Sequence, residues 1–496
     1  LADRASMEGS IVEYALDVAI SPLVKSNLLQ VNHTVGMIFS GDSTTAPKIS
    51  LFDSETKNSV NSHFKIRTEG DSDVYSTFSK YANITEDFDC VHLTSENLSA
   101  YFLPKFKKYV SGGRKASFSV DFGTTNTHIE YRIDNAQSEG VNWSYNENVI
   151  SSASGYLYNR PTRSMSESFV RFTTAMDLFV KELIPYSLGA NSDASFPTRT
   201  ALIEKSDVNY NVNTDIFTDA NIGFAYEKLP VSSNDKVRTN LKWSHSGNEA
   251  DSKRVEIFFE ELLMLCKNVL LINNCSIEDS KIVWTYPTAM SVHRLNMLRV
   301  NWEKAAGKVF EGESLPRLES ATESLAPFYY YSTFEDLNYL VKPVVSVDIG
   351  GGTSDLVVYE RGLPKLVTSF KFAGNDIFGD GLNSNISRNG FFNKYKSKYE
   401  QLLLENELTE LADVMNTVIR EQNNSGDFVN FLFSLKGNRK VLERSGNIDF
   451  EKDLTKDDSM RSVFLLYYSA LFYHIAELFK VNQLDAPNNL LFSGTG

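Results

Sequence analysis

The chain has 496 residues, of which 42% are hydrophobic and 23% are charged, a composition typical of a globular protein with more than one domain. Its formal net charge of −14 argues against a nucleic-acid partner, because phosphate binding requires clustered lysine and arginine. The three cysteines are too few for a disulfide framework or a cysteine-based metal site.

Targeting signals are not evident in the sequence. The longest apolar stretches, 257–272 and 463–479, are interrupted by polar residues, and none approaches the roughly 18 apolar residues that a membrane span requires. The first ten residues lack the basic and apolar regions of a signal peptide. We therefore expect a cytoplasmic protein with no membrane span.

Residues 1–115 are expected to form an accessory region, whose fold the sequence does not define. The pattern favours an amphipathic helix over 11–29 and strands over 35–52 and 61–66. The pair Gly112-Gly113 marks a plausible boundary with the next domain.

A strand–turn–strand pattern follows this boundary and recurs later in the chain. Residues 117–121 (SFSVD) predict a strand, 122–126 a turn and 127–132 a second strand. Residues 344–360 (VVSVDIGGGTSDLVVYE) repeat the order of strand, aspartate, glycine-containing turn and strand. The separation of Asp121 from Asp348 is too large for a solenoid repeat, and it suits two similar domains that face a shared ligand.

The second turn has a composition that suits phosphate binding. Three consecutive glycines, Gly350, Gly351 and Gly352, allow positive φ and let a ligand approach the backbone, whose N–H groups can then converge on an anion. A Walker A loop would lead into a helix and end in Gly-Lys-Ser or Gly-Lys-Thr, whereas this chain returns as a strand. The pattern indicates a phosphate-binding hairpin with a carboxylate beside it.

The remaining elements alternate between helix and strand. We expect a helix over 255–271, a strand over 281–286, a helix over 291–309 and a short helix after 318–323. Residues 391–445 are expected to be largely helical, 461–481 to form a long apolar helix and 489–492 to form a last strand.

The order of these motifs resembles the nucleotide-binding core of the Hsp70/actin/sugar-kinase superfamily. The segments DFGTTNT, WTYPTAMSVHR, LESATESLA, DIGGGTSDLVV, AGNDIFGDGLN and LLFSGTG are similar to its phosphate-1, connect-1, phosphate-2 and adenosine motifs, and most like those of Hsp70-like and bacterial actin-like ATPase domains. The resemblance implies an α/β fold with two ribonuclease H-like lobes, 116–342 and 343–496, the second ending within the adenosine motif. ATP and Mg²⁺ would lie between the lobes.

The resemblance also implies roles for individual residues. Asp121 and Asp348 match the carboxylates that hold Mg²⁺, while Glu319, Asp348 and Asp355 match the catalytic acidic residues, with Glu319 placing the attacking water. The loop around Glu319 lacks the Asn and Pro of the Hsp70 motif, and a helix-capping role is an alternative for this glutamate. The residues matching nucleotide contacts are Gly123, Thr124, Thr125, Asn126, Lys242, Gly350, Gly351, Gly352, Thr353, Gly374, Asp376, Gly379, Gly381, Gly494 and Gly496. For Lys242, an ordinary surface charge is the alternative.

The predicted function is Mg-dependent ATP binding with slow hydrolysis, as in a nucleotide switch that acts on a protein partner or through self-association. Phosphoryl transfer asks a protein mainly for positioning and charge stabilisation, which these residues can supply. Two alternatives stay open at this point, namely a small-molecule kinase for a sugar or an acid, and a filament or scaffold protein whose assembly is set by nucleotide.

Overall fold

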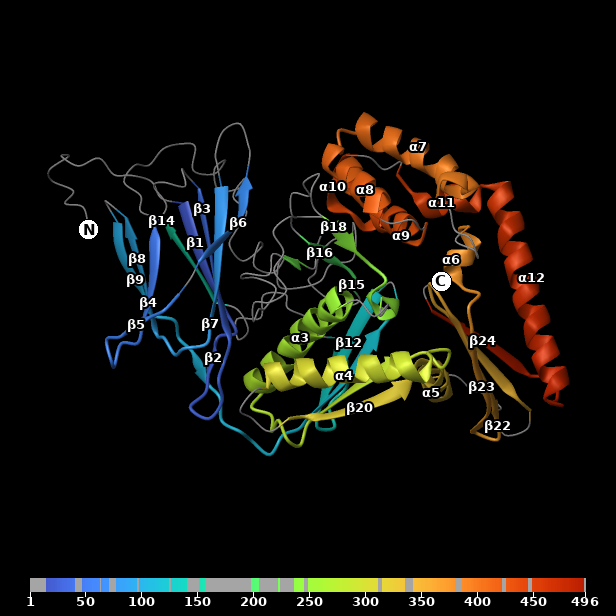
Figure 1. Ribbon diagram of the computed structural model, residues 1–496, viewed down its shortest axis with the longest axis horizontal. Coiled ribbons are helices and arrows are strands. Elements are labelled where there is room, and N and C mark those ends of the chain that lie inside the picture. Colours follow the sequence, from blue (N-terminus) through green and yellow to red (C-terminus); the bar gives the residue numbers. More distant parts are fainter. Residues whose placement is uncertain are drawn as a thin grey trace.

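The computed structural model describes three bodies that lie in a row along the longest axis of the molecule (Figure 1). An all-β sandwich is followed by two units that each combine a sheet with helices. The described residues are 15–40, 47–62, 64–70, 77–95, 98–124, 126–140, 151–156, 198–204, 222–223, 236–244, 249–310, 315–334, 342–379, 386–421, 425–444 and 448–494. The mixed α/β architecture expected from the sequence is confirmed.

The sandwich is built from two antiparallel sheets. Its strands are β1 (Ala15–Ser21), β3 (His33–Ser40), β4 (Lys48–Phe52), β5 (Ser59–Val60), β6 (Lys65–Gly70), β7 (Thr77–Ile84), β8 (Cys90–Ser95), β9 (Leu98–Phe102) and β14 (Ser151–Tyr156). The two strand orders are β14-β1-β3-β7-β6 and β5-β4-β8-β9. Alternating apolar side chains, such as Ile49 and Leu51 on β4, point into a shared core.

Two expectations for this region differ from the structure. The helix expected over 11–29 is wrong in its described part, where β1 and β2 (Val24–Lys25) are extended. Val18 and Ile20 are both buried in the sandwich core, which is the period-two spacing of a strand. The strand β14 comes from the range assigned to the first lobe, yet it pairs with β1.

The sandwich is fastened to the unit that follows it by buried polar contacts. The short parallel pair of β2 and β10 (Lys107–Lys108) leads into this junction. Lys267, which is 3% exposed, donates to the carbonyl oxygens of Gln30 (3.0 Å) and Val309 (2.8 Å). Tyr109 Oη donates to the Cys275 carbonyl at 2.8 Å. Because the bonds to the Val309 and Cys275 carbonyls are buried, losing their donors would leave these two carbonyls unsatisfied.

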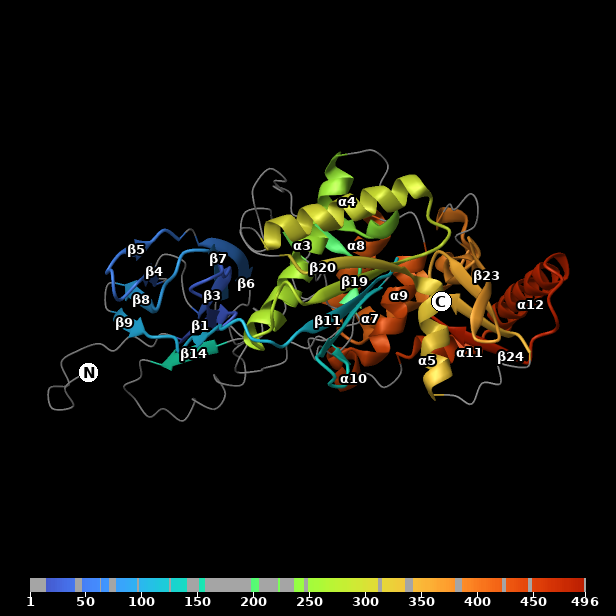
Figure 2. The same cartoon turned by 90° about the horizontal axis from the view of Figure 1, so that it is seen from below.

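The first α/β unit carries its helices on one face of its sheet (Figure 2). The sheet order is β13-β12-β11-β19-β20, and β19 and β20 run parallel to β11. The large helices α3 and α4 pack against each other, and their buried side chains form the core with the sheet. The elements are β11 (Ala116–Phe122), β12 (Asn126–Ile133), β13 (Glu139–Gly140), β15 (Thr198–Arg199), β19 (Lys281–Tyr286), β20 (Arg317–Thr322), α3 (Glu249–Ile272) and α4 (Val292–Val309).

Smaller elements of the same region reach toward the second unit. They are β16 (Leu202–Glu204), β17 (Ile222–Gly223), β18 (Lys236–Arg238), η1 (Leu241–Trp243), η2 (Glu323–Leu325) and α5 (Ala326–Phe334). Phe328 on α5 stacks on Tyr359 of the second unit with ring centroids 3.3 Å apart. Thr239 Oγ1 donates to Asp427 Oδ2 at 2.7 Å. The two units therefore make contact at α5 and again at Thr239, just before η1.

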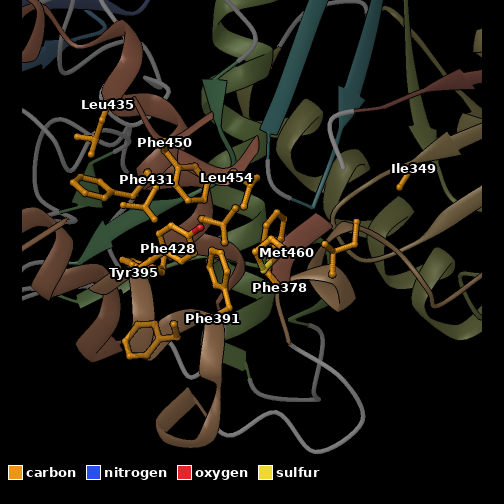
Figure 3. Packing of buried hydrophobic residues seen from close by; sticks show 14 of the residues in the cluster. Ile349, Phe378, Phe391, Tyr395, Phe428, Phe431, Leu435, Phe450, Leu454 and Met460 are labelled. Carbon is orange, nitrogen blue, oxygen red and sulfur yellow. The ribbon is translucent and has the colours of Figure 1, made fainter. Parts of the chain in front are cut away.

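The second unit repeats the central topology of the first. Its sheet order is β23-β22-β21-β24, with β22 antiparallel and β24 parallel to β21, as β12 and β19 are to β11. Helices inserted between β23 and β24 enclose an aromatic core that includes Phe378, Phe391, Phe428 and Phe450 (Figure 3). The elements are β21 (Val344–Ile349), β22 (Ser354–Glu360), β23 (Leu363–Phe370), β24 (Asn489–Ser493), α6 (Gly374–Ile377), η3 (Ile386–Arg388), α7 (Gly390–Glu405), α8 (Thr409–Glu421), α9 (Gly426–Ser434), η4 (Leu435–Gly437), α10 (Arg439–Arg444), α11 (Phe450–Thr455) and α12 (Asp458–Val481).

The helix α12 is apolar on both its covered and its outer side. It buries Tyr467, Leu471 and Ile475 against the core of the second unit. Leu465 and Leu466 on its outer side are 71% and 73% exposed. Among the described residues, α12 is the one helix that is long and apolar enough to cross a membrane by length and composition, and 22% of its apolar stretch is buried.

The contact between the sandwich and the first unit gives a first testable prediction. Lys267→Met keeps the length of the side chain but removes both hydrogen bonds and leaves the buried Val309 carbonyl without its donor, so we expect a loss of about 1–3 kcal/mol in the free energy of unfolding. Urea unfolding followed by circular dichroism measures this loss. Lys304→Met, at an exposed position on α4, is the matched control, and equal midpoints for the two variants would contradict the prediction.

Candidate functional site

The two predicted hairpins are formed and lie against each other where the two α/β units meet. The strands β11 and β12 make the first hairpin, and β21 and β22 make the second. A Cβ built on Gly352 in the second turn would lie 3.9 Å from Thr124 Oγ1 in the first turn. The two turns therefore lie next to each other, at Gly352 and Thr124.

Each hairpin holds one aspartate whose carboxylate accepts from a hydroxyl on the neighbouring parallel strand. Asp121 near the end of β11 accepts from Thr285 Oγ1 of β19 at 3.1 Å. Asp348 near the end of β21 accepts from Ser493 Oγ of β24, also at 3.1 Å. The same strand topology thus places an equivalent carboxylate–hydroxyl pair in each unit, at the carboxyl ends of parallel strands, where ligands bind in α/β folds.

The second turn is braced from behind by the segment that follows β23. Within the turn, the Gly350 N–H donates to the Thr353 carbonyl at 2.9 Å. From behind, the Gly374 N–H donates to the Gly350 carbonyl (3.0 Å) and the Asn375 N–H to the Gly351 carbonyl (2.9 Å). These bonds engage the Gly350 and Gly351 carbonyls, so the turn has a fixed backbone shape.

Glycine is required at two further positions beside the aspartates. Gly494, with φ of +101°, lies so close to the second hairpin that an added Cβ would sit 2.1 Å from the Ile349 carbonyl oxygen and 2.7 Å from Asp348 Oδ1. A Cβ on Gly123 would lie 2.3 Å from the Asn126 carbonyl oxygen. Any side chain at either position would displace the backbone that shapes the site.

A buried ion pair lies between the hairpins. Lys242 on η1 is 2% exposed, and its Nζ donates to Oε1 of Glu323 on η2, whose side chain is 14% exposed. Burial, together with the charges of Asp121 and Asp355, raises the pKa of Glu323 to about 8 against the opposing effect of Lys242. Lys242 is therefore a buried charge paired with Glu323 and not a surface charge.

The aspartates of the second hairpin share this electrostatic environment. Burial, together with the charges of Asp121 and Asp355, raises the pKa of Asp348 from 3.8 to about 6. Burial also raises the pKa of Asp355, which is the register partner of Asp348 and accepts from Thr288 Oγ1 of the first unit at 3.3 Å. The carboxylates are thus close enough to destabilise one another's ionised forms.

The structure separates Glu319 from this cluster and places Glu323 in it. Glu319 lies in the middle of β20 with its side chain 48% exposed, and its charged partner is Lys281, 4.0 Å away. Glu323 follows directly after the end of β20. Glu323 lies at the carboxyl end of the parallel strand β20, the edge at which ligands bind in α/β folds, whereas Glu319 lies inside the strand, and the catalytic role expected for Glu319 stays a prediction.

Other predicted site residues have structural partners. Asp376 accepts from the Ala373 N–H at 2.9 Å and so caps the short helix α6. Gly379 has φ of +88°, and an added Cβ would lie 2.7 Å from the Asn389 amide nitrogen. Asn126 opens β12, and Thr353 is 6% exposed in the second turn. Thr125, Gly381 and Gly496 lie outside the described residues.

The sequence analysis missed Trp243 as well as Glu323. Trp243 Nε1 donates to Thr124 Oγ1 at 2.9 Å, and a Cβ on Gly352 would lie 3.9 Å from the same nitrogen. The contact joins residues far apart in the chain, and its one signal in the sequence is that Trp243 directly follows Lys242.

The donor set fits a hard divalent cation that keeps part of its hydration. Within the described ranges, no group of three or more His, Cys, Asp or Glu side chains could hold a metal ion. Asp121 and Asp348 provide two carboxylates, and a cation beside them would offset the repulsion that raises the pKa of Asp348. Mg²⁺ is typically held in this way, by one or two carboxylates together with water and phosphate oxygens.

Comparisons with known proteins give matches among solved structures alone, since no protein-family model and no curated protein matches this chain. One similar structure is MreB5 of Spiroplasma citri bound to ADP, at 14% identity and a TM-score of 0.29, covering 54% of this chain and 55% of that one. Another is the Ppx/GppA family member of Aquifex aeolicus, at 10% identity and a TM-score of 0.24, covering 66% and 90%. An archaeal actin homolog in complex with ADP matches at 10% identity and a TM-score of 0.26, covering 66% and 84%.

The chain thus spans little more than half of the length of the MreB5 structure. The function proposed below rests on the geometry of the two hairpins.

The raised pKa of Asp348 gives a second prediction. The folded protein binds this proton more tightly than the unfolded chain, so the wild type should lose stability as the pH rises from about 4 to about 6. Asp348→Asn has no such charge, and above pH 6 its free energy of unfolding should exceed that of the wild type by on the order of 2–3 kcal/mol.

Urea unfolding of both proteins between pH 4 and pH 8, without nucleotide or Mg²⁺, measures this difference. Asp413→Asn, at an exposed position on α8, serves as the control. A difference between Asp348→Asn and wild type that does not change with pH would contradict the assignment of the buried charge.

Proposed function

We propose that this protein binds ATP with Mg²⁺ between its two α/β units and hydrolyses it slowly. The observation that carries the proposal is the meeting of two glycine turns, each with an aspartate, around the Lys242–Glu323 pair. The two units then correspond to the two lobes of an actin-like ATPase, with 116–342 and 343–496 as their ranges. Two elements of the range 116–342 lie against other parts of the chain: β14 pairs with β1 of the sandwich, and α5 stacks on Tyr359 of the second unit.

The phosphates would lie along the two turns. We expect the backbone N–H groups of Gly351 and Gly352 and the Thr124 hydroxyl to donate to phosphate oxygens, while the Gly350 N–H stays bonded to the Thr353 carbonyl and shapes the turn. Lys242 adds a positive charge that is buried and therefore weakly screened. Gly494, which matches the adenosine motif, lets its strand end pack directly against Ile349 and Asp348 of the second hairpin. Asp121 and Asp348 would hold Mg²⁺, which when bound neutralises charge on the phosphate oxygens.

Glu323 is the residue that we assign to the attacking water. Its carboxyl lies beside Lys242 and its pKa of about 8 suits a group that accepts a proton near neutral pH. Asp355 is placed to orient water or the Thr288 hydroxyl. Hydrolysis by one such base, without a further cation supplied at the site, is typically slow, and slow hydrolysis suits a switch.

A switch affects a partner only if its two nucleotide states bind that partner with different affinity. The contacts between the units, Thr239 with Asp427 and Phe328 with Tyr359, are those that a change in the angle between the units would alter. The sandwich is fastened to the first unit, so it would move with that unit. A protein partner or self-association therefore belongs to the proposal.

The two glutamates offer a matched pair of variants. Glu323→Gln should lower the rate of phosphate release from Mg-ATP by about 100-fold or more, because it removes the proton acceptor, while ATP affinity stays within a few-fold of wild type. Glu319→Gln, on the half-exposed middle of β20, should hydrolyse ATP at the wild-type rate. Single-turnover hydrolysis with labelled ATP measures both. Loss of activity in Glu319→Gln with normal activity in Glu323→Gln would reverse the assignment.

Two further measurements separate the proposed switch from the kinase and filament alternatives. Faster phosphate transfer on adding a sugar or a carboxylic acid would identify a kinase. ATP-dependent sedimentation at high protein concentration would identify a filament. Neither response is expected for a switch that acts on a different protein.

A further inference from the structure

We propose that Trp243 is a positioning residue, which fixes the Thr124 hydroxyl as a hydrogen-bond donor to the nucleotide phosphates and ties the first glycine turn to the second. This inference rests on the proposed function and assigns a role that neither the motifs nor the resemblance gives to this residue. It concerns the phosphates of the nucleotide and leaves the nucleoside untouched.

The indole occupies the point at which the two turns meet. Its Nε1 donates to Thr124 Oγ1 at 2.9 Å, in the first turn. The Gly352 backbone of the second turn faces both groups, since its added Cβ would lie 3.9 Å from Thr124 Oγ1 and 3.9 Å from Trp243 Nε1. One ring therefore contacts the phosphate-binding elements of both units.

The chemistry of the two groups sets the direction of the hydrogen bond. An indole N–H can only donate, whereas a threonine hydroxyl can either donate or accept. Because Trp243 donates, Thr124 Oγ1 must accept in this contact, and its own O–H proton is left to point elsewhere. A phosphate oxygen is an acceptor, so a hydroxyl held in this state is prepared to donate to it.

Two cations from different units hold the indole in place. The Arg294 guanidinium carbon, from α4 of the first unit, lies 5.7 Å from the ring centroid. Lys371 Nζ, from the segment after β23 in the second unit, lies 6.0 Å from it. Both distances are within the range of cation–π attraction. The ring is thus restrained by both units. If the units moved apart, one of the two cations would be lost and Thr124 would be held less firmly.

A single turn of 3-10 helix supplies this contact together with the buried lysine. Lys242 and Trp243 are adjacent on η1, and one contacts Glu323 while the other contacts Thr124. Leu241 at the start of η1 is buried in the core of the first unit and anchors the turn. Movement of η1 would therefore change the lysine and the threonine contacts at the same time.

The test compares Mg-ATP with adenosine, which lacks phosphates. Trp243→Phe keeps an aromatic ring but removes the N–H, and it should weaken Mg-ATP binding by about three- to tenfold without changing the affinity for adenosine. Thr124→Val removes the hydroxyl without touching the ring and should show the same selective loss. The double variant Trp243→Phe/Thr124→Val should bind Mg-ATP no more weakly than Thr124→Val alone, because both changes remove one interaction.

Calorimetric titration of wild type and the three variants measures these affinities, with thermal unfolding as a check that each variant folds. Equal losses for ATP and adenosine, additive losses in the double variant, or wild-type ATP affinity in Trp243→Phe would each overturn the inference and leave the proposed function standing. If Trp243→Phe fails to fold, an unselective effect of Thr124→Val overturns it. No binding of Mg-ATP by the wild type would instead refute the proposed function itself.

Discussion

The main constraint where the two α/β units meet is electrostatic. Several carboxylates lie around one buried lysine, and burial makes their ionised forms unfavourable. Besides burial, the charges of Asp121 and Asp355 raise the pKa values of Glu323 and Asp348, and Lys242 is the cation among these carboxylates. Burial raises the pKa values of Glu323 and Asp348, so each negative charge weakens the nucleotide-free protein. Added positive charge would offset this cost, which agrees with the proposal that the site binds a cation together with phosphate.

The duplicated topology explains how this arrangement arises from the chain. In each unit an antiparallel hairpin pairs with a following parallel strand, and the hydroxyl on that strand, Thr285 or Ser493, meets the aspartate of the hairpin. The two turns then meet at Thr124 and Gly352. A change in the relative position of the units would move the two turns apart. It would also alter the contacts at Thr239 and Phe328, so the geometry of the site is linked to those contacts.

Local sequence patterns predicted the structural features that depend on neighbouring residues in the chain. The hairpins could be predicted because Asp121 and Asp348 stand at the ends of strands that continue into glycine turns. Glu319 and Glu323 lie in one short motif, and the end of β20, which the sequence pattern does not fix, distinguishes the position of Glu323 from that of Glu319. Trp243 and β14 were missed because their partners, Thr124 and β1, are distant in the chain and no local pattern marks a long-range pair.

The most direct test of this account is calorimetric titration of the purified protein with ATP, with and without Mg²⁺, for wild type and Asp348→Asn. We expect wild type to bind ATP more tightly with Mg²⁺ and to hydrolyse it, and Asp348→Asn to lose both the Mg²⁺ dependence and the hydrolysis while retaining the fold. The exposed variant Asp413→Asn should behave as wild type. Binding and hydrolysis by Asp348→Asn at wild-type levels, or no binding of adenine nucleotide by the wild type, would contradict the account.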